Sequence, residues 1–558
     1  MKTNILKTVT VILGASVALS GCIKETHPDG SYVTPDQIQE SPFAQDGLLA
    51  SISTILITNY VGIGEHFDFG YPSIFGATDR LAGEVFPVSG NLPGGNQYYD
   101  RWQGYLYPYY STGLAATGYC TPFFYLNYYN FIKTANDVID TVGEAEATKE
   151  SRGVAKTFRA SFYLDLARLY DPLFAKAPER PEYEEQVVAE NIKEHTVPIV
   201  FGSTSLDEMK NNPRATREEI FTLIFSDLDD AEECLANYTP ATKSLPSLAV
   251  VYGLKARAYL WLGGFDNQYD NIPTGEAAYR KAAEYARKAI TASGCTIMNE
   301  AQWTDPITGF NTVNGSWMWA MIQSTDTVLN NLLSWTAHMS PEAIWGYGYG
   351  AQPGISVFSY QRINSADFRR KVFVGPDRSY AAIKPYTNLT EDEFKTIAPY
   401  ASFKFHTHNG EKNSYTIGNV TDIPIMRVEE MYLTEAEAQA HYDIAAAKAS
   451  LNAFMANRAP GYSCPAAAVT AEAVAEECLF QKRIEFWGEG IVFYDMKRLN
   501  IGMQNGNAGT NAPSMAKYTT DGRAPWWNCV IPSSAVDQNK ALIGNNNPDP
   551  TKTVKSKE

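Results

Sequence analysis

Segments with the apolar period of an α-helix are the feature of this sequence that most constrains its fold. In residues 154–174 apolar side chains recur at spacings of three and four, which is the spacing of one helix face: Val154, Phe158, Phe162, Leu166 and Leu169. Pro172 ends this run because proline cannot continue a helix. Residues 123–142 form a similar run directly before it. The two segments are therefore expected to form a pair of packed helices.

Further helical segments follow at residues 216–235, 247–263 and 276–290. Thr216 and Glu219 have the spacing of a capping box, which marks the start of the first of these helices. Successive helix pairs with small residues at their contacts look like degenerate tetratricopeptide units, although the 34-residue period is interrupted by loops.

Helical patterns return near the C-terminus, at residues 423–440, 445–459 and 470–487. Thr470 is expected to be the N-cap of the last of these segments. The repeated pattern favours a helical frame built from both halves of the chain.

Residues 42–558 are predicted to form a single, mostly α-helical domain. Two stretches rich in glycine, proline and aromatic residues, 64–121 and 298–421, are predicted to be loop-rich inserts. The remaining residues are assigned to the helical frame, at about 42–63, 122–297 and 422–500, and to a C-terminal cap and tail, at 501–558.

The inserts contain the candidate ligand-binding residues. A neutral sugar offers C–H faces that pack on aromatic rings and hydroxyl groups that need polar partners, so rings beside polar side chains in loops favour sugar binding. Two clusters have this pattern: Asn96, Tyr98, Tyr99, Asp100, Arg101 and Trp102, and Trp335, Trp345, Tyr347, Tyr349 and Gln352. For any single ring, burial between loop and helix is the alternative. The net charge of −16 argues against a nucleic-acid partner.

The N-terminus has the pattern of a targeting signal. Lys2 and Lys7 precede a short apolar stretch at residues 9–19, and small residues then lead into Cys22. This resembles the signal of bacterial lipoproteins, which implies removal of residues 1–21 and acylation of Cys22. Residues 22–41 would then be a flexible, lipid-anchored tether.

Glu485 and Glu489 are the strongest candidates for acid–base chemistry, because glycosidases place two carboxylates across the bond that they cleave. A spacing of four is common on any helix, however, and no histidine, oxyanion donor or metal ligand clusters beside them. We therefore interpret them as structural carboxylates that pair with Arg483, Lys497 or Arg498 where two helices join. No catalytic residue is predicted.

No cofactor or metal site is predicted either. His406 and His408 have the spacing of one strand face, but no third ligand is evident. A structural calcium ion on loop carboxylates such as Asp266 and Asp270 stays open, without the spacing of an EF-hand.

Disulfide pairing also stays open. The six cysteines after Cys22 include no Cys-x-x-Cys pair, and Cys464 and Cys478 are the nearest two in sequence. An oxidising location permits disulfides, but spacing does not determine which cysteines pair.

The order of several motifs resembles the SusD/RagB family of outer-membrane nutrient-binding lipoproteins. The matching pieces are Arg-x-x-Glu-x-Tyr-Leu-x-x-Ala-Glu-Ala at residues 427–438, Glu-Phe-x-Gly-Glu-Gly with a later Asp-Met-x-Arg at 485–498, and segments 155–170, 451–459 and 530–548. The chain departs from the family pattern at Gln481, Lys482 and Val492, at the turn Asp171-Pro172 and at Asn546-Asn547.

The resemblance implies an α-α superhelix of about four tetratricopeptide-like helix pairs that supports a looser binding region. It also implies a non-catalytic surface lipoprotein that captures an oligosaccharide and delivers it to a SusC-like TonB-dependent transporter in the outer membrane. A peptide ligand, or a purely structural scaffold for surface proteins, stays open as an alternative.

Overall fold

The computed structural model of the protein describes most of the chain. The described residues are 35–58, 66–102, 106, 113–118, 120–173, 189, 191–328 and 330–550. Cys22 and the expected signal segment lie outside these ranges, so their role stays a prediction. Within the described ranges, no helix is both long enough and apolar enough to cross a membrane.

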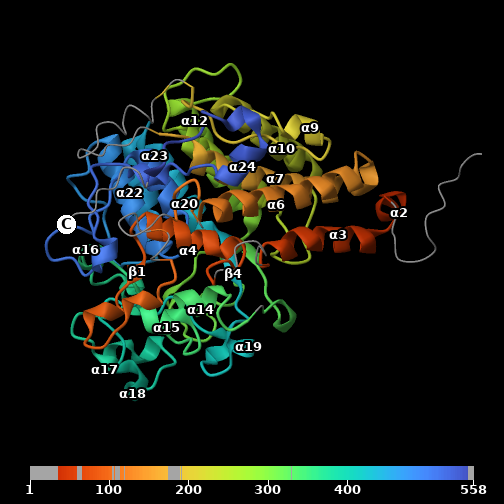
Figure 1. The fold of residues 1–558 in the computed structure, drawn as a ribbon. Helices are drawn as coiled ribbons and strands as arrows, with labels where there is room; N and C mark the ends of the chain where they lie inside the picture. Colours follow the sequence, from red (N-terminus) through yellow and green to blue (C-terminus); the bar gives the residue numbers. More distant parts are fainter. Residues whose placement is uncertain are drawn as a thin grey trace, which may run out of the picture.

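The helical frame is built from long helices that pack mostly in the order of the sequence (Figure 1). Its helices are α6 (Cys120–Val142), α7 (Lys149–Tyr170), α10 (Arg217–Cys234), α11 (Leu248–Leu262), α12 (Gly275–Ser293), α20 (Val428–Ala440), α21 (Ile444–Met455), α22 (Ala471–Glu485) and α23 (Val492–Leu499). The predicted pair α6 and α7 is confirmed, and α12 packs on α20, which joins the two halves of the frame. The mostly α-helical architecture is therefore as predicted.

The predicted helix ends are also confirmed. The Thr216 hydroxyl accepts from the Glu219 amide at 3.1 Å, and the Glu219 carboxylate accepts from the Thr216 amide at 2.8 Å, so both halves of the capping box form at α10. Thr470 is the N-cap of α22, where its hydroxyl accepts from the Ala473 amide at 3.2 Å.

Shorter elements make up the rest of the described chain. The helices are α2 (Pro35–Glu40), α3 (Pro42–Ile55), α4 (Tyr71–Leu81), α9 (Leu206–Met209), α13 (Glu300–Trp303), α14 (Trp335–Met339), α15 (Tyr347–Ala351), α16 (Val357–Arg362), α17 (Tyr380–Ile383), α18 (Glu391–Phe394), α19 (Tyr415–Gly418) and α24 (Ser533–Gln538). The strands are β1 (Phe86–Pro87), β2 (Trp317–Met321), β3 (Pro353–Gly354) and β4 (Ile423–Arg427).

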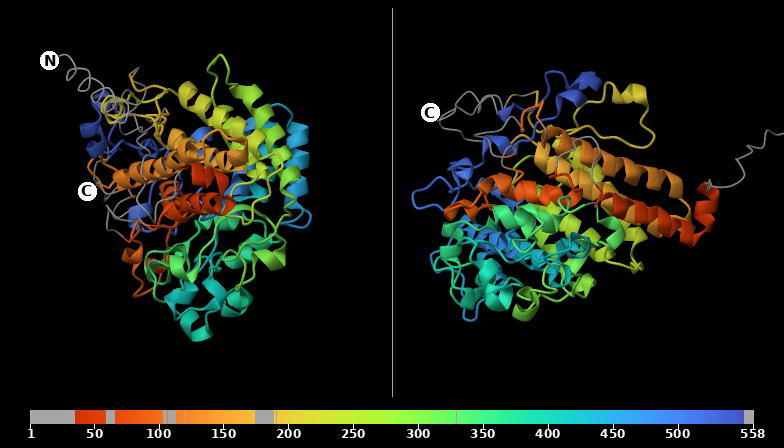
Figure 2. Two further views of the ribbon diagram at one scale, coloured as in Figure 1. Left: turned by 90° about the vertical axis from the view of Figure 1, so that its right-hand side faces the viewer. Right: turned by 60° about the horizontal axis from the view of Figure 1, so that its bottom comes forward.

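Two small antiparallel sheets connect the inserts to each other and to the frame. β1 of the first insert pairs with β3 of the second, with Phe86 opposite Gly354. β2 of the second insert pairs with β4, which leads into α20. As a result the part that contains α14, α15, α17, α18 and α19 lies together on one side of the frame, as two views agree (Figures 1 and 2).

The first insert, predicted to be loop-rich, contains a buried helix that the sequence analysis did not identify. α4 begins after Gly70, whose φ of 84° is in the left-handed region that glycine favours, and Pro72 lies in its first turn. Every residue of α4 is buried. It is short, and its sequence contains Pro72 and Gly76, which are poor helix formers, so the composition indicated a loop.

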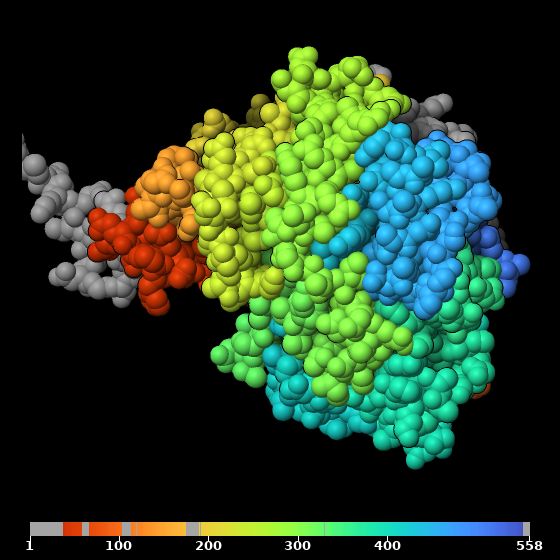
Figure 3. Space-filling model, turned by 180° about the vertical axis from the view of Figure 1, so that it is seen from behind, coloured from red at the N-terminus to blue at the C-terminus, as the bar shows by residue number. Residues whose placement is uncertain are grey.

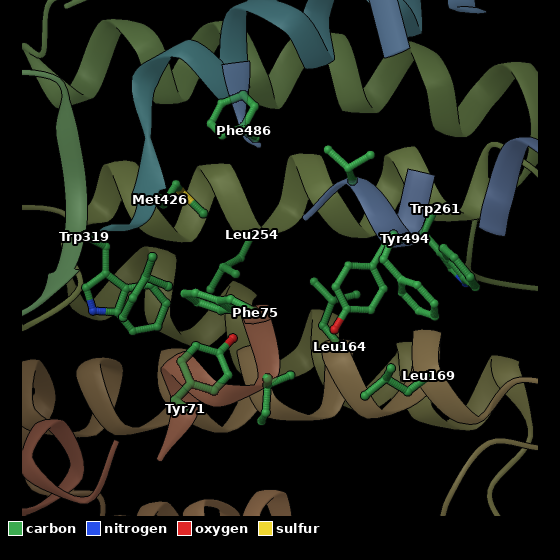
Figure 4. Packing of buried hydrophobic residues seen from close by; sticks show 14 of the residues in the cluster. Tyr71, Phe75, Leu164, Leu169, Leu254, Trp261, Trp319, Met426, Phe486 and Tyr494 are labelled. Atoms are coloured by element: carbon green, nitrogen blue, oxygen red, sulfur yellow. The ribbon is translucent and has the colours of Figure 1, made fainter. Parts of the chain in front are cut away.

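The main core lies between α4, α7, α11 and α23 (Figure 4). Side chains from these four helices pack there: Tyr71, Phe75, Leu164, Leu169, Leu254, Trp261 and Tyr494. The Tyr71 and Tyr128 hydroxyls donate to the Asp165 carboxylate at 2.6 and 2.9 Å, so these buried polar atoms are satisfied. This core fixes the first insert to the frame.

Candidate functional site

The two carboxylates of the Gly-Glu-Gly segment belong to a buried cluster of charges. Glu485, at the end of α22, is 0% exposed and accepts from Arg458 at 2.8 and 2.9 Å. Arg369 and Arg427 donate to the same carboxylate at 3.1 and 3.2 Å. Glu489 accepts from Lys404 at 2.6 Å and from Arg427 at 2.8 and 2.9 Å. We refer to these six residues as the buried charge cluster.

Electrostatics keep Glu485 ionised in this enclosed place. Burial alone would favour the neutral acid, but the charges of Arg458, Arg427 and Arg369 outweigh burial and lower the pKa of the carboxyl group. Because the carboxylate is buried and fully engaged with arginines, it has no face for a substrate. A structural role, as interpreted from the sequence, agrees with this geometry.

The predicted partners of these carboxylates were wrong. Arg483 ion-pairs with Glu84 at 2.7 Å, and Arg498 with Asp495 at 2.9 Å. Lys497 donates to two backbone carbonyl groups near the end of α7, at 2.8 and 3.0 Å. The true partners come from distant segments, so neighbouring positions in the sequence could not reveal them.

Two glycines explain why the chain leaves the helical path here. Gly488 and Gly490 have φ angles of 82° and 76°, in the region that favours glycine. A Cβ atom at Gly488 would lie 2.4 Å from the Phe405 ring, and one at Gly490 would lie 2.4 Å from the Phe75 Cα. The Gly-Glu-Gly segment is therefore a tightly packed turn between α22 and α23.

The exposed members of the two predicted ring clusters meet at α15. Tyr99 packs on Gly350, where an added Cβ atom would lie 2.6 Å from the Tyr99 Cγ. The Arg101 guanidinium carbon lies 5.7 Å from the centre of the Tyr347 ring. Tyr98 and Tyr99 are 68% and 49% exposed. These contacts join the surface around Tyr99 and Arg101 to that of α15.

We call this surface the aromatic surface and define it as Tyr98, Tyr99, Arg101, Trp345, Tyr347 and Tyr349. Trp345 packs on Gly418 of α19, where an added Cβ atom would lie 2.2 Å from its ring. Its indole nitrogen donates to the Asn419 side chain at 3.1 Å. Trp345, Tyr347 and Tyr349 are half-buried, so part of each side chain is accessible to a ligand.

Other predicted residues are buried beneath or beside this surface. Trp102, Trp335, Asp100 and Gln352 are all buried. The Asp100 carboxylate accepts from Arg80 of α4 at 3.0 and 3.2 Å. The Gln352 amide donates to the Thr396 carbonyl at 2.8 Å and accepts from the Ala398 amide at 2.8 Å. In this structure these side chains support the surface rather than line it.

Asn96 is exposed beside the aromatic surface, and its side chain accepts from the Tyr98 amide at 2.9 Å. Sequence reasoning missed His66, whose ring nitrogen is hydrogen-bonded to the Tyr347 hydroxyl. Nothing in the sequence near His66 indicated a site, because it meets Tyr347 only through the fold.

The candidate metal ligands do not gather into a site in the described part of the chain. No group of three or more His, Cys, Asp or Glu side chains there is arranged to hold a metal ion. His406 is instead hydrogen-bonded through Nδ1 to the buried Glu342 carboxylate at 3.0 Å. The cysteines of this part are all free: Cys120, Cys234, Cys295, Cys464, Cys478 and Cys529.

The whole described fold is similar to solved structures. A SusD-like carbohydrate binding protein from Bacteroides vulgatus shares 19% sequence identity at a TM-score of 0.64, over 93% of this chain and 99% of that one. A SusD superfamily protein from Bacteroides thetaiotaomicron shares 16% identity at a TM-score of 0.63, over 92% and 100%. A putative sugar binding protein from Bacteroides vulgatus shares 18% identity at a TM-score of 0.60, over 93% and 99%.

Two family models match the sequence. The model described as the SusD family matches residues 362–548. This range includes all six residues of the buried charge cluster and helices α20 to α23. A second model, described as starch-binding associating with outer membrane, matches residues 101–260, which include α6, α7 and α10. No sequence among the curated proteins matches the chain. The two matches identify the chain as SusD-like, in agreement with the order of its motifs.

Proposed function

We propose that the protein is a non-catalytic, lipid-anchored receptor of the cell surface that binds an oligosaccharide at the aromatic surface. The observation that carries this proposal is the contact of Tyr99 and Arg101, from the first insert, with α15 of the second, beside further accessible rings. Rings that are fixed on one side and open on the other suit the C–H faces of sugars. Asn96, which is exposed, supplies a hydrogen-bonding group beside them.

The comparisons support the ligand class and the location. The second matching model is described as starch-binding associating with outer membrane, and one similar structure is described as a carbohydrate binding protein. Anchoring through Cys22 and delivery to a SusC-like TonB-dependent transporter rest on the family resemblance. A receptor of this kind needs no reacting group, and the enclosed carboxylates Glu485 and Glu489 suit that role.

Affinity electrophoresis against a panel of polysaccharides tests the proposal. We expect at least one polysaccharide to slow the wild type, and Tyr98→Ala or Trp345→Ala to weaken that binding roughly tenfold, as loss of a central ring at an interface costs about 1–2 kcal/mol. Tyr285→Ala is the matched control, because Tyr285 is a half-buried tyrosine of α12 in the frame.

The possible outcomes separate the alternatives. Unchanged mobility of the wild type on every polysaccharide overturns the sugar proposal and turns attention to peptides. If Tyr285→Ala weakens binding as much as Trp345→Ala does, the ligand does not bind specifically at the aromatic surface.

A further inference from the structure

A groove without a role in the proposed function lies between α16, the loop after α21, and α22. Its volume is about 420 Å³, within the range of roughly 300–1,000 Å³ that is usual for small-molecule sites. No residue of the aromatic surface lines it. Viewed from behind, the light-blue part of the chain, which contains α21, lies above the green-teal part (Figure 3).

The floor of the groove is fixed by the buried charge cluster. Asp367 and Gln481 line the groove and also bind Arg369 of that cluster. Arg369 donates to the Asp367 carboxylate at 2.7 Å and to the Gln481 backbone carbonyl at 3.2 Å. A floor held in this way does not need to reorganise when a ligand binds, which favours affinity.

One wall holds an arginine in a fixed orientation. The Arg362 guanidinium carbon lies 3.8 Å from the centre of the Phe480 ring, and its Nη2 donates to the Glu477 carboxylate at 2.6 Å. Glu477 is buried, and its other oxygen accepts from the Tyr462 hydroxyl at 2.8 Å and from the Gln481 amide at 2.8 Å. Arg362 is thus oriented by a carboxylate that is itself fixed.

Arg362 keeps unused hydrogen-bond donors at the groove. Its side chain is 51% exposed, and among the described residues its Nε and Nη1 groups donate to no acceptor. Asn364 lines the same groove, and its side-chain oxygen accepts from the Ala366 amide at 2.9 Å, which leaves its NH₂ group for a ligand. The exposed Ser463 hydroxyl adds a further donor and acceptor.

The charges of the lining favour a neutral ligand. The positive charge of Arg362 is balanced by Glu477, and the negative charge of Asp367 by Arg369. A phosphate or another polyanion would meet two carboxylates, whereas a neutral polyol places adjacent hydroxyl groups on the arginine fork and its C–H face on the apolar wall. Ile363 and Ile484 supply that wall.

We propose that this groove is a second carbohydrate site, which takes one or two neutral sugar units. It takes the same class of ligand as the proposed function but uses different residues, so either site can exist without the other.

Saturation-transfer NMR with free mono- and disaccharides tests the groove in a variant whose aromatic surface is altered. On the Tyr347→Ala background we expect saturation transfer to at least one sugar to persist. Adding Arg362→Met, or Ser463→Trp to fill the groove, is expected to lower that transfer about fivefold, the effect of losing a few hydrogen bonds and contacts.

The Tyr347→Ala background distinguishes sugar binding in the groove from sugar binding at the aromatic surface. Saturation transfer that is absent in Tyr347→Ala, or that both groove substitutions leave unchanged, overturns the second site. Neither result contradicts ligand binding at the aromatic surface. Ser463→Trp removes no buried contact, since Ser463 is exposed, so it decides the question if Arg362→Met unfolds.

Discussion

Replacing Glu485 by alanine is predicted to destabilise the protein strongly without removing its ligand site. The substitution deletes the carboxylate that receives Arg458, Arg369 and Arg427. Arg369 keeps Asp367 as a partner, and Arg427 keeps Glu489. The loss of ion pairs therefore affects mainly one arginine.

Arg458 is the residue that loses most. Its remaining carboxylate partner in the structure is Glu429, at 3.5 Å, and the Met298 carbonyl accepts from it at 2.6 Å. Removing one member of a buried ion pair costs about 3–5 kcal/mol, because the other charge stays buried without compensation. We expect Glu485→Ala to lower the free energy of unfolding by roughly that amount.

Urea unfolding followed by tryptophan fluorescence measures this effect. Glu276→Ala is the matched control, because Glu276 pairs with Arg280 at 2.7 Å on the exposed face of α12 and is 59% exposed; such pairs contribute about 0–1 kcal/mol. The polysaccharide affinity of Glu485→Ala below the unfolding transition should equal that of the wild type. If Glu485→Ala were no less stable than Glu276→Ala, or folded normally but lost binding, the structural assignment of the cluster would be refuted.

Three further predictions follow from single positions. Burial raises the pKa of Asp79 to about 8, so the folded state keeps a proton that the unfolded state releases above pH ~4. Stability should therefore fall as pH rises from about 4 to about 8. Asp79→Asn should flatten this fall in urea titrations, and an unchanged slope would contradict the prediction. Burial lowers the pKa of Lys497 to about 7, so between about pH 7 and pH 10 the unfolded state binds a proton that the folded state does not. The stability of the wild type relative to Lys497→Met should therefore rise over this range, by at most ~1.4 kcal/mol per pH unit. A stability difference that did not change with pH would contradict this. Gly350→Ala should push Tyr99 away, since its Cβ would lie 2.6 Å from the Tyr99 Cγ, and should weaken polysaccharide binding with little change in melting temperature; equal affinity would show that Tyr99 does not contact the ligand.

The helical frame could be predicted because its helices carry their own signals. Thr216 and Glu219 cap α10 through local contacts, and the apolar period of residues 154–169 appears in the sequence itself. α4 was missed because it lies in a stretch rich in glycine, proline and aromatic residues, where Gly70, Pro72 and Gly76 indicate a loop. Local signals therefore identified the frame, whereas the helix-breaking residues of the first insert concealed the helix that anchors it.

The candidate site could be predicted only as two regions. Ring-rich composition located both clusters, but it did not separate Tyr98 from Trp102, which lie four residues apart and are exposed and buried respectively. That difference is set by α4, whose Arg80 binds Asp100. The partners of Glu485 could not be predicted for the same reason, since Arg369 and Arg458 contact it only through the tertiary fold.

A crystal structure of the protein with a retained oligosaccharide tests the central claim most directly. The account predicts sugar rings stacked on the aromatic surface, in contact with Tyr98, Trp345 or Tyr347, with hydroxyl groups near Arg101. An oligosaccharide bound only elsewhere, for example beside Tyr285 of α12, with the aromatic surface free of sugar, would contradict it.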